Sequence, residues 1–330
     1  MDPRRLTGET AARATVGLLV LGLPLVVFGI RLFPPTLTLH ARVSEDGGWM
    51  PDVVRARVGE PLELRLIADD VAHGFAVGHS ASPALDLSPG QTVRTTLAFA
   101  EPGTYTFYCT RWCGPNHWRM RGVIEVSGVA GPTAANEPPL YVALGIDLDA
   151  PRPVPAIPLG RPSADRGAGL AASAPETFLT DAAYFSRSPS VAFLALRADR
   201  ATATLDDSQV WDLIAWIWST HTTMETIEAG AALFAQNCAA CHGETGTGDG
   251  VMAGTIPAAT MDDPSSTEPL RPADLADPAR LLSASPALLH GKITRGGMGT
   301  GMPYWGPILT DAQIWALVDY LWTFQFEESQ

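Results

Sequence analysis

The sequence is poor in positive charge, in lysine and in cysteine, and each scarcity narrows the classes of protein that fit. Lys and Arg total 22 against 35 for Asp and Glu, a formal charge of −13, which argues against nucleic-acid binding and favours basic or neutral partners. Lys292 is the single lysine. The four cysteines fall in two short motifs with ligand or attachment spacing, so none remains for a structural disulfide. With 330 residues, 46% of them hydrophobic, the chain can form about two domains with real cores.

An apolar run near the N-terminus is long enough to span a bilayer. From Ala14 to Ile30 it is uncharged and mostly apolar. We predict a cytoplasmic tail at residues 1–12, a transmembrane helix at 13–33 and a connector at 34–48. More arginines precede the span than follow it, so the positive-inside rule places the N-terminus in the cytoplasm and the rest of the chain outside. A cleaved signal peptide is the alternative.

Residues 49–128 carry the pattern of a β-sandwich. Leu62, Leu64 and Leu66 alternate with charged residues, as in a strand with one buried face. Turn signals rich in glycine and proline separate short segments of β-branched and aromatic residues. The predicted strands are Val53 to Val58, Leu62 to Ile67, Thr92 to Phe99, Thr104 to Cys109 and Gly122 to Val126. Short strands at this spacing predict an all-β sandwich.

A cluster of metal-binding residue types lies between the last two predicted strands. The run from Cys109 to Met120 reads C-T-R-W-C-G-P-N-H-W-R-M, so two thiols, one imidazole and one thioether occur within twelve residues. This set of soft ligands suits copper, with zinc as the main competitor. His73, in V-A-H-G-F, lies at a strand end 36 residues before Cys109.

The combination of His73 with this loop resembles the copper A domain of subunit II of haem-copper cytochrome oxidases, over residues 49–127. The resemblance implies a cupredoxin fold with two copper ions bridged by two cysteine thiolates. Carried over to this sequence, the copper ligands are the sulfurs of Cys109 and Cys113, the imidazoles of His73 and His117, the thioether of Met120 and the backbone carbonyl of Arg111. Two bridging thiolates spread one electron over both metals, so little has to move on reduction.

The sequence departs from the commonest members of that family in three ways. Arg111 stands where many of these oxidases have a glutamate that reaches a magnesium site, which puts that site in doubt. The family's aromatic run for accepting electrons is missing, and Trp49, the nearest aromatic residue to its place, is the possible point of electron entry. A single predicted span, where the commonest oxidases have two in this subunit, resembles the single-span branch.

Residues 129–222 separate the sandwich from the C-terminal unit. Residues 129–176 are rich in proline and are predicted as an extended linker. Beyond them, Leu205 to Thr220 aligns without gaps on Leu309 to Phe324, with six identical positions. Both stretches are predicted as amphipathic helices, capped near Asp206 and Thr310. Residues 177–222 are either the haem-less remnant of a second copy of the C-terminal domain or helices that converged through similar burial.

The C-terminal unit, 223–330, opens with a predicted helix over residues 226–236 that leads into Cys238-Ala-Ala-Cys241-His242. C-x-x-C-H is the attachment signature of a c-type haem, in which the thiols add to the vinyl groups and the histidine ligates the iron. Met302, followed by proline in a glycine-rich loop, is the predicted second axial ligand. Residues 226–325 resemble a class I cytochrome c, which implies an all-α fold.

One other methionine competes for the role of axial ligand. Met298 is the rival of Met302, since it lies in the same glycine-rich loop. Met252 and Met261 are predicted to be packing residues.

Together the resemblances imply the electron-transfer subunit of a haem-copper terminal oxidase, anchored in a bacterial cell membrane with its soluble domains on the periplasmic side. Electrons would pass from the haem to the dinuclear copper site and on to a membrane-embedded subunit I that reduces oxygen. The chain has no predicted catalytic residue of its own. The expected partners are subunit I, the lipid bilayer, and an electron donor such as a soluble or membrane cytochrome or a small copper protein.

Other functions remain open at this stage. The same role in a copper A-containing nitric oxide reductase is the nearest alternative. A non-enzymatic copper carrier or redox sensor is the hypothesis from a different class. Nitrous oxide reductase also uses copper A, but its catalytic cluster needs many more histidines than the seven present.

Overall fold

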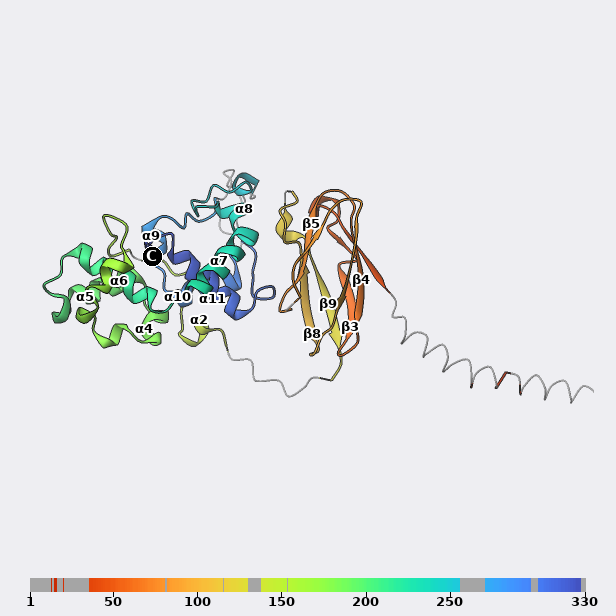
Figure 1. The fold of residues 1–330 in the computed structure, drawn as a ribbon, viewed down its shortest axis with the longest axis horizontal. Helices are drawn as coiled ribbons and strands as arrows, with labels where there is room; N and C mark the ends of the chain where they lie inside the picture. Colours follow the sequence, from red (N-terminus) through yellow and green to blue (C-terminus); the bar gives the residue numbers. More distant parts are fainter. Residues whose placement is uncertain are drawn as a thin grey trace, which may run out of the picture.

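The structure, a computed structural model, describes residues 13, 15–16, 20, 36–80, 82–114, 116–129, 138–152, 154–255, 271–297 and 302–327. Within these residues a β-sandwich is followed along the chain by a helical region, and the two lie side by side (Figure 1). Apart from residues 13, 15, 16 and 20, the predicted transmembrane segment lies outside the described residues. No helix in the described part of the chain is both long and apolar enough to cross a membrane.

The sandwich consists of two sheets, one of four strands in the order β2-β1-β4-β7 and one of five in the order β3-β9-β8-β5-β6. All five predicted strands are present, and β1, β2, β5 and β6 are additional. The strands are β1 (Leu37–Ala41), β2 (Trp49–Met50), β3 (Val53–Arg57), β4 (Leu62–Ala68), β5 (His73–Val77), β6 (Leu85–Leu87), β7 (Thr92–Leu97), β8 (Gly103–Tyr108) and β9 (Arg121–Ser127).

Strand β1 lies within the predicted connector, so the sandwich starts earlier in the chain than predicted. It pairs in parallel with β4 along its whole length, from Leu37 opposite Leu64 to Ala41 opposite Ala68. Leu39 and Ala41 are both fully buried in the core. The sandwich therefore begins near residue 37 rather than residue 49, and the prediction of a connector over 34–48 is wrong for the part that forms β1. The alternation of apolar residues at 37, 39 and 41 is the sequence signal for this strand.

Three neighbouring strands deliver the metal-binding residues to one end of the sandwich. Strands β8 and β9 are antiparallel, and the loop from Cys109 to Met120 connects them. Strand β5, which begins at His73, pairs with β8 and so brings this histidine next to the start of the loop. Gly74 permits this approach, because a Cβ at that position would lie 2.0 Å from Oγ1 of Thr110.

The helical region contains the three predicted helices at their expected places, α6, α7 and α11. Asp206 and Thr310 are the N-caps of α6 and α11, and each forms a capping box with the glutamine three residues on. The described α-helices of this region are α2 (Leu140–Ala143), α3 (Ala164–Ala168), α4 (Asp181–Ser186), α5 (Pro189–Arg197), α6 (Asp207–Ser219), α7 (Met224–Asn237), α8 (Ala239–His242), α9 (Pro278–Leu281), α10 (Pro286–Arg295) and α11 (Asp311–Trp322). Because α2 and α3 fall within 129–176, the predicted linker is not extended throughout.

The repeated helices α6 and α11 make the same kind of helix crossing. Helix α3 packs on α6 through Gly167, where a Cβ would lie 2.0 Å from the carbonyl oxygen of Asp212. Helix α7 packs on α11 through Gly230, where a Cβ would lie 2.0 Å from the carbonyl oxygen of Ala316. Asp212 and Ala316 are equivalent positions in the sequence repeat. Each repeated helix therefore has a packing partner that crosses it at an equivalent position, and the partner of α6 lies before residue 177.

A second pair of contacts follows the same repeat. The ring of Phe193 in α5 stacks on Trp211 of α6, with 4.7 Å between centroids. The ring of His290 in α10 stacks on Trp315 of α11, with 4.3 Å between centroids. Both α5 and α10 start with a serine N-cap followed by proline. The region around α6 and the region around α11 thus each place three helices in equivalent positions. These are α3, α5 and α6 in the first region and α7, α10 and α11 in the second.

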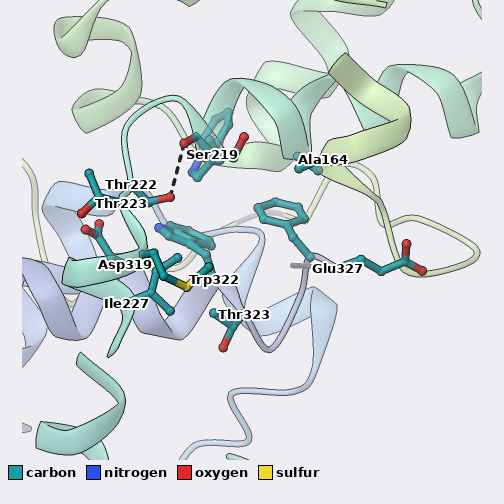
Figure 2. Close-up of a pocket in the computed structure, with 13 residues that line it drawn as sticks. Ala164, Ser219, Thr222, Thr223, Ile227, Asp319, Trp322, Thr323 and Glu327 are labelled. Carbon is teal, nitrogen blue, oxygen red and sulfur yellow. Dashed lines mark hydrogen bonds between the residues drawn. The ribbon is translucent and has the colours of Figure 1, made fainter. Parts of the chain in front are cut away.

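The two helical units meet at α6 and α11. Trp218 and Trp322, equivalent in the repeat, form an edge-on pair with 6.2 Å between centroids. Beside them lies a cavity of about 190 Å³, whose lining includes Asp319 and Trp322 (Figure 2). Asp319 is only 8% exposed.

Candidate metal and haem sites

The loop between β8 and β9 gathers the predicted copper donors around two sulfur atoms. The Sγ atoms of Cys109 and Cys113 lie 4.0 Å apart, and both cysteines are buried. Around Cys109, Nδ1 of His73 lies at 3.9 Å and the backbone carbonyl oxygen of Arg111 at 3.1 Å. His73, Cys109 and Cys113 together form a group able to hold a metal ion.

The second sulfur has a matching environment. Nδ1 of His117 lies 3.4 Å from Sγ of Cys113, and Sδ of Met120 lies 3.2 Å from the same sulfur. Each cysteine thus has one imidazole and one weak donor beside it, a carbonyl for Cys109 and a thioether for Cys113. This set of soft donors fits copper, and the donors divide into two groups around the paired sulfurs.

Groups behind the donors hold two of them in place. Oδ1 of Asp70 lies 2.7 Å from Nε2 of His73, so the other ring nitrogen, Nδ1, faces Cys109. The indole Nε1 of Trp49 donates a hydrogen bond of 3.2 Å to the carbonyl of Met120.

Trp49, the possible point of electron entry, lies inside the sandwich. It is 2% exposed and packs edge-on against Phe75 and Phe107 in the core. A docked donor could not contact this indole directly, and electron entry at Trp49 stays a prediction. Its contact with Met120 makes it a positioning residue for the loop.

The second pair of cysteines lies at a different kind of site. Cys238, Cys241 and His242 end α7 and form α8, at the wall of a cavity of about 370 Å³. Met302 lies in the wall of the same cavity. The apolar part of the lining comes mainly from Phe234, Met252, Leu275, Leu281, Leu288, Leu289, Ile293, Trp305, Leu317 and Leu321. This deep apolar cavity with a C-x-x-C-H sequence in its wall fits a covalently attached haem.

The side chain of His242 has one ring nitrogen engaged in a hydrogen bond and the other free to bind a metal. Its Nδ1 lies 3.0 Å from the carbonyl oxygen of Ala273, an acceptor that requires the proton on Nδ1 and leaves Nε2 free as a ligand. Burial lowers the pKa of His242, which keeps the imidazole neutral, as a metal ligand must be. Met302 lines the cavity and would be the candidate for a second haem ligand, Met252 is buried in the lining, and Met261 and Met298 lie outside the described residues.

The two cysteine pairs differ in acid–base character. Burial raises the pKa of Cys238 to about 12 and also raises that of Cys241, so both are protonated thiols in the absence of haem. In the other pair the hydrogen bond between the two sulfurs lowers the pKa of Cys109, as do the nearby imidazoles, and the same hydrogen bond and burial raise the pKa of Cys113. A stabilised thiolate suits a metal ligand, whereas protonated thiols in an apolar wall suit attachment to a haem vinyl group.

The haem-type cavity reaches the copper-type loop. Its lining includes Tyr108, Cys109, His117, Trp118, Met120 and Arg121 from the sandwich. In Figure 1 the helical region faces the sandwich at this position, with α8 and β5 near each other. Both candidate sites therefore share one wall.

A set of contacts outside the predicted site residues joins the two parts. The guanidinium of Arg121 lies 5.7 Å from the ring of Tyr304 and 5.5 Å from that of Trp305, and donates a hydrogen bond of 3.3 Å to the carbonyl of Tyr304. Nε2 of His79 lies 2.9 Å from the carbonyl of Gly306. At Gly78 a Cβ would lie only 2.6 Å from the carbonyl oxygen of Pro307.

These contacts hold the segment that follows Met302 against the sandwich. Arg121 is the residue directly after the ligand candidate Met120, and this adjacency is the one sequence signal that could have drawn attention to it. Nothing local in the sequence points to its partners.

The fold combines a cupredoxin-like sandwich that carries a sulfur and imidazole site with an α-helical domain that carries a C-x-x-C-H cavity. Comparisons with known proteins agree with this combination. Residues 52–127 match the family "Cytochrome C oxidase subunit II, periplasmic domain", and residues 227–325 match the family "Cytochrome c". The chain thus carries a periplasmic domain of the cytochrome c oxidase subunit II type followed by a cytochrome c domain.

Individual relatives match the sandwich part of the chain. Cytochrome c oxidase subunit 2 of Thermus thermophilus is 29% identical over 79 residues, which are 24% of this chain and 58% of that protein. A second subunit 2 from the same species is also 29% identical over 79 residues, 46% of its length. The chain therefore spans about half the length of these curated relatives. The periplasmic domain of subunit II of cytochrome oxidase from Bradyrhizobium japonicum is 18% identical, covering 28% of this chain and 84% of that one, with a TM-score of 0.26.

Proposed function

We propose that this chain is the electron-transfer subunit, of the subunit II type, in a membrane haem-copper terminal oxidase. A c-type haem would supply one-electron chemistry at Cys238, Cys241 and His242, and a dinuclear copper centre would supply it at the β8–β9 loop. Electrons would then leave through that loop to a membrane-embedded subunit I that reduces oxygen. The observation that carries this proposal is the shared wall, because one cavity is lined both by the C-x-x-C-H motif and by copper-donor candidates Cys109, His117 and Met120.

The residues of the chain have distinct parts in this function. Cys109 and Cys113 would bridge two copper ions, with His73, His117, Met120 and the carbonyl of Arg111 completing the ligand set. Asp70 and Trp49 position two of these donors. His242 and Met302 would be the axial ligands of the haem. The segment after Met302 would hold the haem domain against the sandwich. The effective concentration of the haem at the copper site would then be high.

The partners of the chain belong to the same proposal. A transmembrane helix at 13–33 would anchor the protein in a bacterial cell membrane with the N-terminus in the cytoplasm and the two domains on the periplasmic side. The acidic cytochrome domain favours a donor with a basic face, such as a soluble or membrane cytochrome or a small copper protein. The same subunit would serve equally in a copper A-containing nitric oxide reductase.

One experiment distinguishes an oxidase subunit from a nitric oxide reductase subunit and from a copper carrier or sensor. The complex is purified through a tag on this chain, its copper and haem contents are measured, and its consumption of oxygen and of nitric oxide is followed with the same electron donor. Two coppers and one covalent haem per chain with oxygen uptake support the proposal. Nitric oxide consumption without oxygen uptake selects the alternative, and one reversibly bound copper without either activity favours a carrier or sensor.

We also propose that residues 163–222 are a second, haem-less copy of the cytochrome unit. The glycine-mediated crossings at Gly167 and Gly230 support this interpretation over convergence, because a shared helix pattern does not by itself require a shared packing partner. Covalent haem in a chain shortened to end at residue 222 would refute it.

A further inference from the structure

The wall of the haem-type cavity contains a group of cations. Arg152, Arg271, Arg280 and Lys292 all line it. The region from residue 225 to 328 has 13 carboxylates but only four basic residues, and three of those four lie in this wall. Basic side chains that gather in one cavity of an otherwise acidic region point to an anionic ligand.

Arg152 differs from the other three because it comes from outside the cytochrome domain. It lies before residue 227, where the match to the cytochrome c family begins. It ends a segment, residues 138–152, that contains α2 and that we call the strap. The strap therefore supplies a wall residue to a cavity formed mainly by a domain that starts some 70 residues later.

The strap is fixed on α10 by packing and by ion pairs. Gly291 of α10 gives room for it, since a Cβ there would lie 2.8 Å from atoms of Leu148 and of Tyr141. The carboxylate of Asp149 binds Arg295 through two contacts of 2.5 and 2.7 Å, and Lys292 at 2.9 Å. Asp149 is only three residues before Arg152, so this anchor determines where the arginine lies.

The guanidinium of Arg152 is incompletely satisfied in its position. Its Nε is buried and has no hydrogen-bond partner in the described part of the chain. Among the described residues, no ion pair joins Arg152, Arg271 or Arg280 to a carboxylate. Burial and the nearby charge of Arg280 lower the pKa of Arg152, and the carboxylate of Asp149 acts in the opposite direction. A half-buried cation with a buried, unused donor beside a second cation is stabilised when an anion contacts that donor.

We propose that the strap completes the haem site and that Arg152, beside Arg280, binds a propionate carboxylate of the haem. The inference rests on the proposed function, in that it requires a haem attached at Cys238 and Cys241. The haem is a dianion at its propionate edge, and a guanidinium offers paired N–H donors to a carboxylate. The linker between the two domains would thus be a binding element for the haem.

The arrangement has a measurable consequence for the haem. A positive charge held near the ring favours the reduced iron, which carries one positive charge less than the oxidised iron. Removal of the charge of Arg152 should therefore lower the midpoint potential of the haem. We expect a fall of about fivefold in the equilibrium constant for haem reduction.

The test uses the full chain with its haem and follows optical redox titrations at one pH and one ionic strength. Arg152→Gln should lower the midpoint potential, and Arg152→Lys should restore part of the shift because the charge is kept and the fork geometry is lost. Arg200→Gln is the matched control, with the same change in net charge at an exposed site on the first helical unit. It should leave the potential unchanged.

A second variant displaces the strap without changing any charge. In Gly291→Ala the added Cβ would lie 2.8 Å from atoms of Leu148 and Tyr141, so the strap should shift and the potential should fall in the same direction, which keeps the test valid if Arg152→Gln does not retain haem. Equal potentials for wild type and Arg152→Gln at equal haem content would overturn the inference, as would an equal shift in Arg200→Gln. Wild-type protein without covalent haem would instead overturn the proposed function, and the inference with it.

Discussion

The guanidinium of Arg121 lies 5.5 Å from the ring of Trp305, and this contact joins the residue after a copper-donor candidate to the segment after a haem-ligand candidate. It belongs to the interface that places the C-x-x-C-H cavity against the β8–β9 loop. A cation over an aromatic ring contributes about 0.5–2 kcal/mol, depending on how far the pair is removed from water. Arg121 is only partly exposed to water, so the contact should matter for how the two domains dock.

Replacing Arg121 should loosen this docking. In Arg121→Gln we expect a several-fold slower transfer of an electron from haem to copper, measured by flash photoreduction of the full chain, with unchanged copper and haem contents. Arg119→Gln is the matched control, because Arg119 is exposed and stacks on Trp118, its sequence neighbour. An unchanged rate in Arg121→Gln would show that the contact does not hold the domains together.

Removing the charge behind His73 should weaken copper binding. The carboxylate of Asp70 fixes the ring of His73, and loss of such a partner typically reduces metal affinity about 10–100-fold. We therefore expect Asp70→Asn to lower copper affinity, measured by competition with a chelator of known affinity. The neighbouring Asp69→Asn is the control, since Asp69 pairs instead with His40 and Arg42. Equal affinities for the two variants would remove Asp70 from the site.

The optical spectrum of the haem should identify its axial ligand. Met302→His should replace the thioether by an imidazole, abolish the absorption band typical of methionine bound to ferric haem and lower the midpoint potential. Met252→Leu, in the lining of the same cavity, should leave that band in place. A band that persists in Met302→His would assign the ligand to another methionine, such as Met298.

Asp319 should make the helical region less stable as the pH rises. Burial in the seam between α6 and α11 raises the pKa of its carboxyl to about 6, from an ordinary value of 3.8 (Figure 2). Between these two values the folded state holds a proton that the unfolded state has released, so the free energy of unfolding falls as pH rises through this window. A shift of about two units corresponds to about 3 kcal/mol.

Asp319→Asn should therefore be more stable than wild type at pH 7, by up to about 3 kcal/mol, and the difference should vanish near pH 4. Urea unfolding followed by tryptophan fluorescence at several pH values measures this. Glu228→Gln, an exposed carboxyl on α7, should give no such difference. A difference between Asp319→Asn and wild type that does not change with pH would contradict the account.

Local spacing explains why much of both sites could be predicted from the sequence. The loop from Cys109 to Met120 and the motif at Cys238 to His242 each concentrate their donors within a few residues, so one turn of backbone suffices to bring them together. Strands such as β4 show a clear alternation of buried and exposed residues. By contrast, β5 is buried along its whole length and shows no alternation, and its pairing with β8 determines where His73 lies.

Residues whose role depends on packing between distant segments could not be predicted. Arg121 and Tyr304 are 183 positions apart, and their contact depends on how two domains dock. Arg152 lies in a proline-rich stretch without any periodic pattern, and packing at Gly291 together with the ion pairs of Asp149 brings it to the cavity. The sequence position of Trp49 does not reveal that its ring is enclosed by Phe75 and Phe107.

The central claim is that an electron passes from haem to copper within one chain. The most direct test is flash photoreduction of the haem in the full chain loaded with copper, followed at the haem and copper absorption bands over a range of protein concentrations. We expect reoxidation of the haem to match reduction of the copper centre with a first-order rate that does not depend on concentration. A rate that rises in proportion to concentration, or haem reoxidation without copper reduction, would contradict the account.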